Sequence, residues 1–347
     1  MPDLNRRSFI EQLGVLGGTG AAVGLAGCTS NSSDSQPSDS GNSTNSGSQS
    51  VSLLIGSVYP SGHAINEMAK DWASTVAEET DDRIDITIEA GFGGEKEVME
   101  QTRIGAIQGT LIGTRWVIDY DPKNFWVESP FVFENWEQQR RAFESEYLED
   151  GRERLREEGN QALIGPPVYR GYRHTSGNQS FKDPSAIQNV NLRVPGLDPW
   201  VNIWDGIGAS PTTVAFDELY SGLQQGVVDA QENPAETMLS ASLYEVQDYY
   251  TLTKHLASTG WCTINTNTLS NMSEEDRNVV TSTLETKINN LSENIAASEE
   301  EAIQSLKDNG MNVVEADRDA WLTAAKEPLQ QQFEADWEPT LEEVRNI

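Results

Sequence analysis

A long amphipathic segment near the C-terminus constrains the fold of this chain more than any other sequence feature. It begins at Ser273, a suitable N-cap with Asp276 three residues later, and it runs to a stop at Gly310. At about 1.5 Å per residue, a helix of about 36 residues would reach roughly 54 Å, well beyond one small domain. We therefore expect this helix to lie across two lobes. Its apolar stripe comprises Val280, Leu284, Ile288, Leu291, Ile295, Ile303 and Leu306. A coiled coil is the alternative, which is disfavoured because the sequence offers no second long helix as a partner.

Short β-like runs alternate with helical patterns before this helix, which is typical of an α/β protein with largely parallel sheets. Residues 51–56 and 84–88 read as strands, residues 63–77 as a helix, and residues 95–107 as a second helix that runs to Gly109. Similar alternation recurs at residues 162–165, 190–194, 216–226 and 249–254. The chain has 347 residues, a length more natural for two domains than for one.

The N-terminal segment has the pattern of an export signal. Arg6 and Arg7 precede an apolar run, residues 13–26, that is shorter than the ~17 residues a membrane-spanning helix needs. A twin arginine before a weakly apolar run resembles the signal for export of folded proteins. Residues 25–28 resemble a lipobox, whose cysteine becomes the lipid-bearing N-terminus after cleavage. We therefore expect residues 1–27 to be an export signal with a lipobox.

Cys28 would then be a lipid anchor that holds the protein at the outer face of the cell membrane. The residues that follow it are rich in Ser and Asn and too polar to pack, so we expect residues 28–50 to be a disordered tether with a span of roughly 26 Å. The alternative is a plain cleaved signal with an incidental cysteine. The tether disfavours that alternative, because an anchored protein needs such a spacer.

The charge balance excludes one class of partner. The chain carries 55 acidic and 24 basic side chains, a formal net charge of −31, so nothing in it attracts a nucleic-acid backbone. Self-repulsion at this charge density falls away in molar salt, where the Debye length shortens to about 3 Å. The scarcity of lysine beside so many carboxylates resembles proteins of extreme halophiles and indicates a haloarchaeal source. An ordinary acidic secreted protein is the alternative.

Residues suited to catalysis or to metal binding are scarce. The sequence has 3 histidines, no Gly-x-Ser-x-Gly motif, no phosphate-binding glycine loop, and no His or Cys pair at metal-ligand spacing. We therefore predict that the protein is not an enzyme and needs no cofactor or metal. Once Cys28 is assigned to the lipid, Cys262 has no disulfide partner, and we expect it to be a small buried apolar residue.

Two arginines and an asparagine stand out in a chain this acidic. Arg193 lies twenty positions after Arg173, and Asn233 lies forty positions after Arg193. Two guanidiniums and a carboxamide offer planar, charge-matched donors for a carboxylate. Arg193 follows the alternating run 190–192 and so should lie at a strand end, where open α/β sheets place ligands. A structural ion pair is the alternative for each arginine, and a turn is the alternative for Asn233, which precedes Pro234.

From residue 51 to the C-terminus, the chain resembles one family of binding proteins. The matching segments are Ser61-Gly62-His63, Gly93-Gly94-Glu95-Lys96-Glu97, the run from Phe216 to Asp229, and Gln231-Glu232-Asn233-Pro234. With the spacing of the arginines, they resemble the solute-binding proteins of tripartite ATP-independent periplasmic (TRAP) transporters, of the C4-dicarboxylate-binding (DctP) type. The resemblance implies a two-lobed α/β fold like that of periplasmic binding proteins, of the class II type, with a long helix crossing both domains.

The resemblance also implies domains that are assembled from discontinuous stretches. Domain I would comprise residues 51–170 plus about 259–298, and domain II residues 171–258 plus about 299–347. The two domains would close on the ligand at the cleft between them.

The site residues implied by the resemblance are the arginines and the asparagine. Arg193 would be the main carboxylate clamp, because a bidentate guanidinium provides a selectivity that lysine lacks. Arg173 would be a supporting cation, although Arg170 is a near neighbour that could be confused with it. Asn233 would donate to a ligand oxygen while its carbonyl holds a neighbouring backbone group.

Four weaker candidates remain. His63 and Glu95 lie near the starts of helices that face the cleft in this family, and Trp200 and Trp261 are aromatic residues that could form walls of the pocket. For each tryptophan taken alone, packing in the core is the preferred interpretation.

The sequence thus predicts an extracytoplasmic receptor for an organic acid, which closes by a hinge and delivers its ligand to a permease driven by an ion gradient. Its partners would be the small organic acid, the small and large integral membrane subunits of a TRAP permease, and the membrane through the lipid. We expect a monomer. Mono- and dicarboxylates, keto and hydroxy acids and sugar acids all fit the predicted clamp. A ligand-sensing lipoprotein that signals to a membrane receptor is the alternative function.

Overall fold

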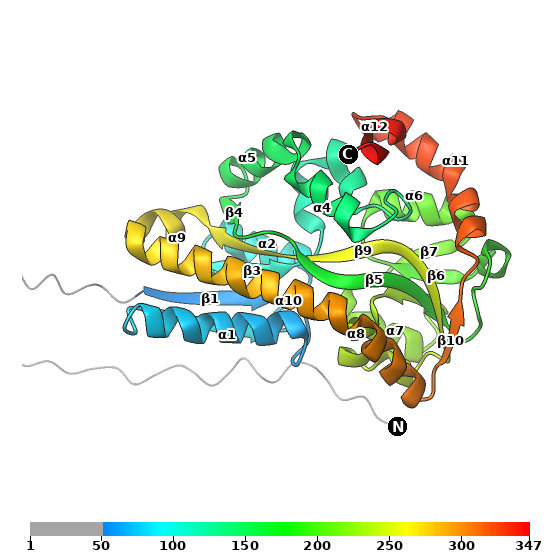
Figure 1. Cartoon of the computed structure of the whole chain (residues 1–347), viewed down its shortest axis with the longest axis horizontal. Coiled ribbons are helices and arrows are strands. Elements are labelled where there is room, and N and C mark those ends of the chain that lie inside the picture. The colour runs from blue at the N-terminus through cyan, green and yellow to red at the C-terminus, as the bar shows by residue number, and fades with distance from the viewer. Residues whose placement is uncertain (1–50) are drawn as a thin grey trace, which may run out of the picture. The chain divides into compact units, whose positions relative to one another are not determined.

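A computed structural model describes residues 51–347 (Figure 1). The predicted export signal, the lipidation site at Cys28 and the tether all lie outside the described residues. Within residues 51–347, no helix is both long enough and apolar enough to cross a membrane.

One group of strands begins the described chain. β1 (Val51–Ser57) pairs in parallel with β2 (Ile84–Ala90) on one side and with β3 (Gly109–Ile112) on the other. α1 (Ala64–Glu79) connects β1 to β2, and the ring of His63 caps its first turn by accepting a hydrogen bond from the backbone N–H of Ile65. The predicted β-α-β beginning is confirmed.

The second helix is shorter than its apolar pattern predicts. α2 (Glu95–Arg103) ends before Ile104, and Gly105 then adopts a positive φ of 76° that stops the helix. The prediction that it runs to Gly109 is wrong. Ile104 is exposed, so its apolar character reflects no packing of that helical face.

A second group of strands is also parallel. β6 (Asn191–Val194) pairs with β7 (Ser210–Thr213) on one side and with β8 (Ala230–Asn233) on the other. α6 (Asp198–Ile207) connects β6 to β7 and packs against α11 (Arg318–Asp336).

Two long antiparallel strands join the groups. β9 (Tyr249–Asn265) pairs with β3 through its C-terminal residues and with β5 (Val168–Gly177) through the rest, and β5 in turn pairs with β8. The strand order is therefore β2-β1-β3-β9-β5-β8-β6-β7, with β4 (Gln161–Leu163) and β10 (Asn312–Glu315) at the margins of β9. The α/β class is confirmed. The expectation of largely parallel sheets is met only in part, because β9 runs antiparallel to β3, β4 and β5, and β5 runs antiparallel to β8.

The long helix is present as predicted. α10 (Glu274–Asp308) has 35 residues, the side chain of Ser273 accepts from the backbone N–H of Asp276 at its start, and Gly310 takes a φ of 97° just after its end. Its first half packs on α1 beside the first group of strands. Its second half packs on α8 (Ala235–Ser240) and β10 beside the second group (Figure 1).

The remaining elements are short and cover the sheet. They are α3 (Arg115–Tyr120), α4 (Trp136–Glu144), α5 (Glu149–Glu157), α7 (Leu219–Gln224), α9 (Thr266–Asn271), α12 (Leu341–Arg345), and the 3-10 turns η1 (Pro122–Glu128), η2 (Glu146–Leu148), η3 (Pro184–Ile187), η4 (Phe216–Glu218) and η5 (Leu243–Glu245). Cys262 is buried in the core, as predicted, and burial raises the pKa of its thiol to about 12.

Candidate ligand-binding site

A cavity of about 650 Å³ lies between the two groups of strands. Its wall is built by segments at the carboxyl ends of β1, β2 and β3 on one side and of β6, β7 and β8 on the other. Open α/β sheets bind ligands at this position. The cavity brings together five of the seven predicted site residues, which are Arg173, Arg193, Asn233, Glu95 and Trp200.

Arg193 is a buried cation with unused donors. It lies in β6 with only 3% of its surface exposed, and its Nε donates to the carbonyl of Val214 at 2.9 Å. Its two terminal nitrogens make no hydrogen bond to any of residues 51–347. Burial lowers the pKa of Arg193 to about 10, which leaves the guanidinium charged at neutral pH.

Arg173 is a different case, because its guanidinium is already paired. Its Nε lies 2.5 Å from Oε2 of Glu232 and its Nη2 lies 2.8 Å from Oε1, so one carboxylate fills both prongs of the fork. Burial alone would raise the pKa of Glu232, but the charge of Arg173 and the hydrogen bond from His255 bring it down to about 2. The face of the Arg173 guanidinium lies over the ring of Trp200, 5.1 Å from its centre.

Asn233 ends β8 and lines the cavity. Its Nδ2 donates to Oε1 of Gln231 at 2.6 Å, and its backbone carbonyl accepts from the hydroxyl of Tyr250 at 3.0 Å. One of the two amide N–H groups is therefore used within the protein, which leaves the other N–H and the amide oxygen for a ligand. The role of Asn233 as a donor to the ligand stays a prediction.

Of the weaker candidates, Glu95 and Trp200 line the cavity. Glu95 is the first residue of α2, and its Oε1 accepts from the backbone N–H of Gly113 at 2.6 Å. Trp200 is buried in α6, where its indole N–H donates to the carbonyl of Glu128 at 2.8 Å.

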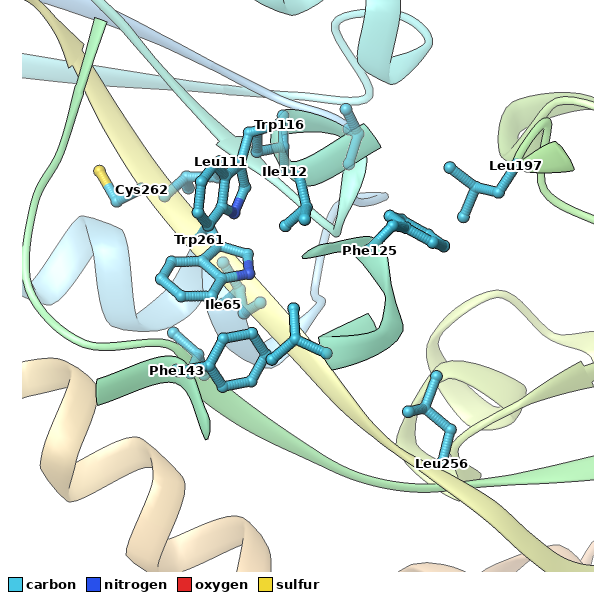
Figure 2. Close-up of a cluster of buried hydrophobic side chains, with 14 of the residues drawn as sticks. Ile65, Leu111, Ile112, Trp116, Phe125, Phe143, Leu197, Leu256, Trp261 and Cys262 are labelled. Carbon is cyan, nitrogen blue, oxygen red and sulfur yellow. The ribbon is translucent and has the colours of Figure 1, made fainter. Parts of the chain in front are cut away.

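His63 and Trp261 lie behind the wall. The ring of His63 stacks on Tyr59 at 4.4 Å and its Nε2 lies 2.9 Å from Glu236. Trp261 packs in the core against Trp116 and Phe143, with ring centres 5.2 and 5.1 Å away (Figure 2). Neither residue lines the cavity, so packing is the better interpretation of Trp261.

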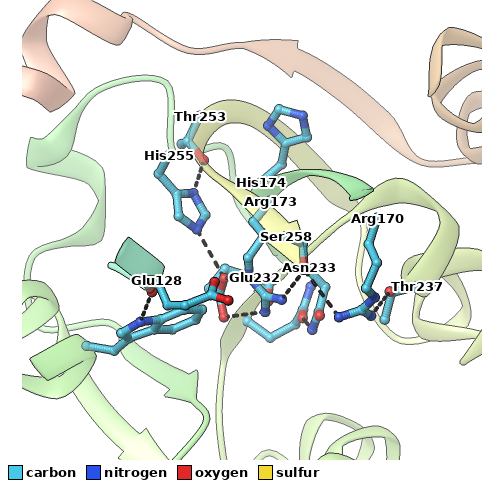
Figure 3. Close-up of polar contacts among 12 residues, drawn as sticks. Glu128, Arg170, Arg173, His174, Glu232, Asn233, Thr237, Thr253, His255 and Ser258 are labelled. Carbon is cyan, nitrogen blue, oxygen red and sulfur yellow. Dashed lines mark hydrogen bonds and ion pairs between the residues drawn. The ribbon is translucent and has the colours of Figure 1, made fainter. Parts of the chain in front are cut away.

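The structure adds Arg170 to the wall. Arg170 and Arg173 both donate to the hydroxyl of Ser258, at 3.2 and 3.1 Å (Figure 3). Residues three apart on a regular strand face opposite sides, but β5 shifts register between Tyr169 and Tyr172, where Gly171 has a φ of 87°. This bulge turns both arginines to the same face. The glycine between them is the one signal in the sequence that pointed to such an irregularity.

Glu128, at the end of η1, is a second addition. It is fully buried and lines the cavity, and its Oε1 accepts from the hydroxyl of Thr259 and from the indole N–H of Trp261. Its Oε2 has no hydrogen-bond partner within the described part of the chain. No sequence pattern distinguishes this carboxyl from the many acidic residues around it.

Comparison with known proteins places the chain in one family. The family model described as bacterial extracellular solute-binding protein, family 7 (DctP), matches residues 55–336. A solute-binding protein of Roseobacter denitrificans is 27% identical over 300 residues, which cover 85% of this chain and 91% of that protein. The sialic acid-binding periplasmic protein SiaP of Vibrio cholerae is 25% identical over 288 residues, covering 82% and 89% of the two chains.

Solved structures agree with this assignment. The TRAP periplasmic solute-binding protein of Roseobacter denitrificans with bound L-galactonate has a TM-score of 0.78 and 26% identity, and the match covers 85% of this chain and 99% of that one. A TRAP periplasmic solute-binding protein of a Bordetella species has a TM-score of 0.79 at 21% identity, over 85% of this chain and 99% of that one. The chain therefore belongs to the DctP family of extracellular solute-binding proteins and has the fold of the TRAP periplasmic binding proteins.

Proposed function

We propose that this protein is the extracytoplasmic receptor of a TRAP transporter and that it captures an organic acid by clamping its carboxylate with Arg193. The observation that carries the proposal is the buried guanidinium of Arg193, whose terminal nitrogens face a cavity without any partner in residues 51–347. A buried charge is costly unless it is paired. A ligand carboxylate would supply both the counter-charge and two parallel hydrogen bonds.

Arg173 and Asn233 support the clamp in different ways. Arg173 is held by Glu232, so we assign it a positioning role next to Ser258 and Trp200 rather than the main charge contact. Asn233 offers its amide oxygen and its second amide N–H to polar groups of the ligand.

Hinge closure is the proposed capture step. The division into residues 51–170 plus about 259–298 and residues 171–258 plus about 299–347 follows the two strand groups, with β5 and β9 as the connections between them. A contact across the cavity supports closure, because Nη1 of Arg115 in α3 donates to the carbonyl of Gly196 after β6 at 3.1 Å. Arg115 is itself paired with Asp119, so this contact needs no ligand charge.

Delivery requires further partners, which we assign from family membership. The receptor would dock as a monomer on the small and large membrane subunits of a permease driven by an ion gradient. The lipid on Cys28, added after twin-arginine export, would hold it at the outer face of the membrane. Release of a Cys28→Ser variant into the soluble fraction would support the anchor, and retention on the membrane would contradict it. The net charge of −31 favours a high-salt habitat such as that of haloarchaea.

A binding experiment tests the proposal. In high salt, a thermal-shift screen of organic acids should find a ligand that raises the melting temperature, since a ligand at ~100 times its Kd stabilises by about 2.7 kcal/mol. Arg193→Ala should then weaken binding by on the order of 3–5 kcal/mol, or several hundredfold or more. Arg193→Lys should recover part of the loss, because it restores the charge without the planar fork.

Arg140→Ala is the matched control, because Arg140 is exposed on α4 and pairs with Glu137 and Glu144 outside the cavity. It should leave affinity unchanged. If Arg193→Ala binds the acid found in the screen with near-wild-type affinity in isothermal titration, the proposed role of Arg193 as the clamp is contradicted.

A further inference from the structure

Most of the guanidinium groups at the cavity already have hydrogen-bond partners within the protein. Arg173 is bound by Glu232, and Arg115 by Asp119. Arg170 donates to the hydroxyls of Thr237 and Ser258. It also contacts the ring of His63, whose Nε2 lies 2.9 Å from the carboxylate of Glu236.

Among the buried guanidiniums of the described wall, Arg193 is the one whose two terminal nitrogens make no hydrogen bond to residues 51–347. A single carboxylate from a ligand would balance it. The ligand's remaining groups would then meet the rest of the wall.

Two acidic side chains line that wall. Glu95 uses one oxygen to accept from Gly113, and its other oxygen has no partner within residues 51–347. Glu128 is fully buried, and its Oε2 is likewise unpartnered. A buried polar atom that stays unpaired costs free energy, so Oε2 of Glu128 is a position where a ligand hydroxyl would be stabilising. The half-buried Glu95 offers a second acceptor on the cavity wall. A second ligand carboxylate next to the Glu95 carboxylate would meet like charge, and it would meet like charge at Glu128 as well once Glu128 is ionised.

We infer that Glu128 and Glu95 determine specificity, making the cavity selective for a hydroxylated acid with one carboxylate, whose hydroxyl groups bind the unpaired oxygens of these two side chains. This inference rests on the proposed function, because it takes Arg193 as the site of the single carboxylate. It narrows the ligand to monocarboxylates with several hydroxyl groups and excludes dicarboxylates of similar length.

The protonation state of Glu128 gives the inference a second signature. Burial raises the pKa of Glu128 to about 8, with the charge of Glu95 adding to the rise, while hydrogen bonds from Thr259 and Trp261 and the charge of Arg173 act against it. The other group that faces it is Tyr59, whose pKa is raised by burial, so its phenol stays neutral. Below about pH 8, Glu128 is therefore a neutral acid that can donate as well as accept. Because its ionised form repels an anion, affinity should fall as the pH rises through about 8.

Matched acids separate the two ligand classes. L-galactonate and galactarate differ only in whether the far carbon is a hydroxymethyl group or a carboxylate, and D-erythronate and meso-tartrate form a shorter pair of the same kind. By isothermal titration at pH 6.5 in high salt, we expect the monocarboxylate of at least one pair to bind ~30-fold or more tightly than its dicarboxylate partner. We expect its affinity to fall by up to about tenfold at pH 9, as Glu128 ionises.

Variants assign these effects to residues. Glu128→Gln keeps a donor and an acceptor, so it should bind the monocarboxylate within about threefold of wild type at pH 6.5 and should lose the pH dependence that wild type shows. Glu95→Gln should lower the ratio of monocarboxylate affinity to dicarboxylate affinity by about tenfold or more. Glu153→Gln, an exposed control on α5, should change neither. If Glu128→Gln fails to fold, the wild-type protein still tests the inference through its ratio of monocarboxylate to dicarboxylate affinity and the pH dependence of that affinity.

The outcomes are distinct from those that test the proposed function. Arg193-dependent binding of a dicarboxylate as tight as that of its monocarboxylate partner would overturn this inference alone and would assign the second carboxylate to Arg170. The same pH dependence in Glu128→Gln as in wild type would also overturn it. Failure of every acid in the panel and in the wider screen to bind would overturn the proposed function and this inference together.

Discussion

Arg173 in β5 and Arg193 in β6 are the same residue type, yet their surroundings give them opposite roles. The fork of Arg173 is filled by Glu232, and the fork of Arg193 is open to the cavity. The sequence predicted that both would lie near Asn233, and the cavity does bring the three together. It could not predict which arginine is free, because the Arg173–Glu232 pair depends on the register of β5 against β8 and not on spacing along the chain.

This difference predicts opposite effects on the unliganded protein. Arg173→Ala leaves a buried Glu232 without its partner and should lower the free energy of unfolding by about 3–5 kcal/mol. Arg193→Ala removes a buried charge that has no acidic partner in the described chain, so we expect a change within about 1 kcal/mol. Urea unfolding without ligand measures both. A loss in Arg193→Ala as large as in Arg173→Ala would mean that Arg193 has a structural role.

Two other residues of the cavity wall, Arg170 and Glu128, could not be predicted from the sequence as parts of the site. Arg170 lies three positions before Arg173, and strict alternation along a strand would place the two on opposite faces. Glu128 is one of 55 acidic side chains, and only its burial against Thr259 and Trp261 sets it apart. Burial of a charged residue type depends on contacts between distant segments, which one sequence does not reveal.

At the scale of elements, local sequence signals predicted the ends of the long helix well, but they did not predict the directions of strands that pair with distant segments. The start and end of α10 were predicted closely because Ser273 and Gly310 act on their own neighbours. The directions of β5 and β9 were missed, since strand direction depends on which distant strand becomes a neighbour. The alternation seen at residues 249–254 marked only the beginning of β9, whose remaining residues are buried and show little alternation of polarity.

The bulge in β5 gives a prediction of its own. Gly171 has a φ of 87°, and an added Cβ would meet Oε1 of Glu299 at 3.3 Å and Pro234 at 3.6 Å. Gly171→Ala should therefore cost about 1–2 kcal/mol of stability from the left-handed backbone. It should also weaken binding of the acid found in the screen, because relaxing the bulge turns Arg170 away from Arg173.

Gly310→Ala is the matched control, since Gly310 has a φ of 97° with open space around it and lies at the end of α10. We expect a similar loss of stability with unchanged affinity. Equal affinity of the two variants would show that the bulge does not position the site. Thermal unfolding and isothermal titration on the same samples give both quantities.

At the scale of the whole molecule, a strongly acidic chain surrounds a site whose proposed ligand is itself an anion. The net charge is −31, while the group proposed to bind the carboxylate is the buried cation of Arg193. An acidic surface keeps the protein soluble in concentrated salt but repels both itself and an anionic ligand in dilute buffer. High salt therefore favours capture of an organic acid by such a protein, because it screens the long-range repulsion and leaves the short-range contact with Arg193 intact.

Stability should accordingly depend steeply on salt. With 55 acidic against 24 basic side chains, most carboxylates lack a basic partner, and raising KCl from about 0.05 M to 2 M shortens the Debye length from more than 10 Å to less than 3 Å. We expect the melting temperature to rise continuously over this range, with the steepest change where the Debye length falls below the spacing of surface charges. Sucrose at matched osmolality is the control, since it is excluded from the protein surface without screening charge. It should give a smaller rise. A melting temperature that is flat in KCl, or that rises equally in sucrose, would show that self-repulsion does not limit the stability of this protein and would remove the argument for a high-salt habitat.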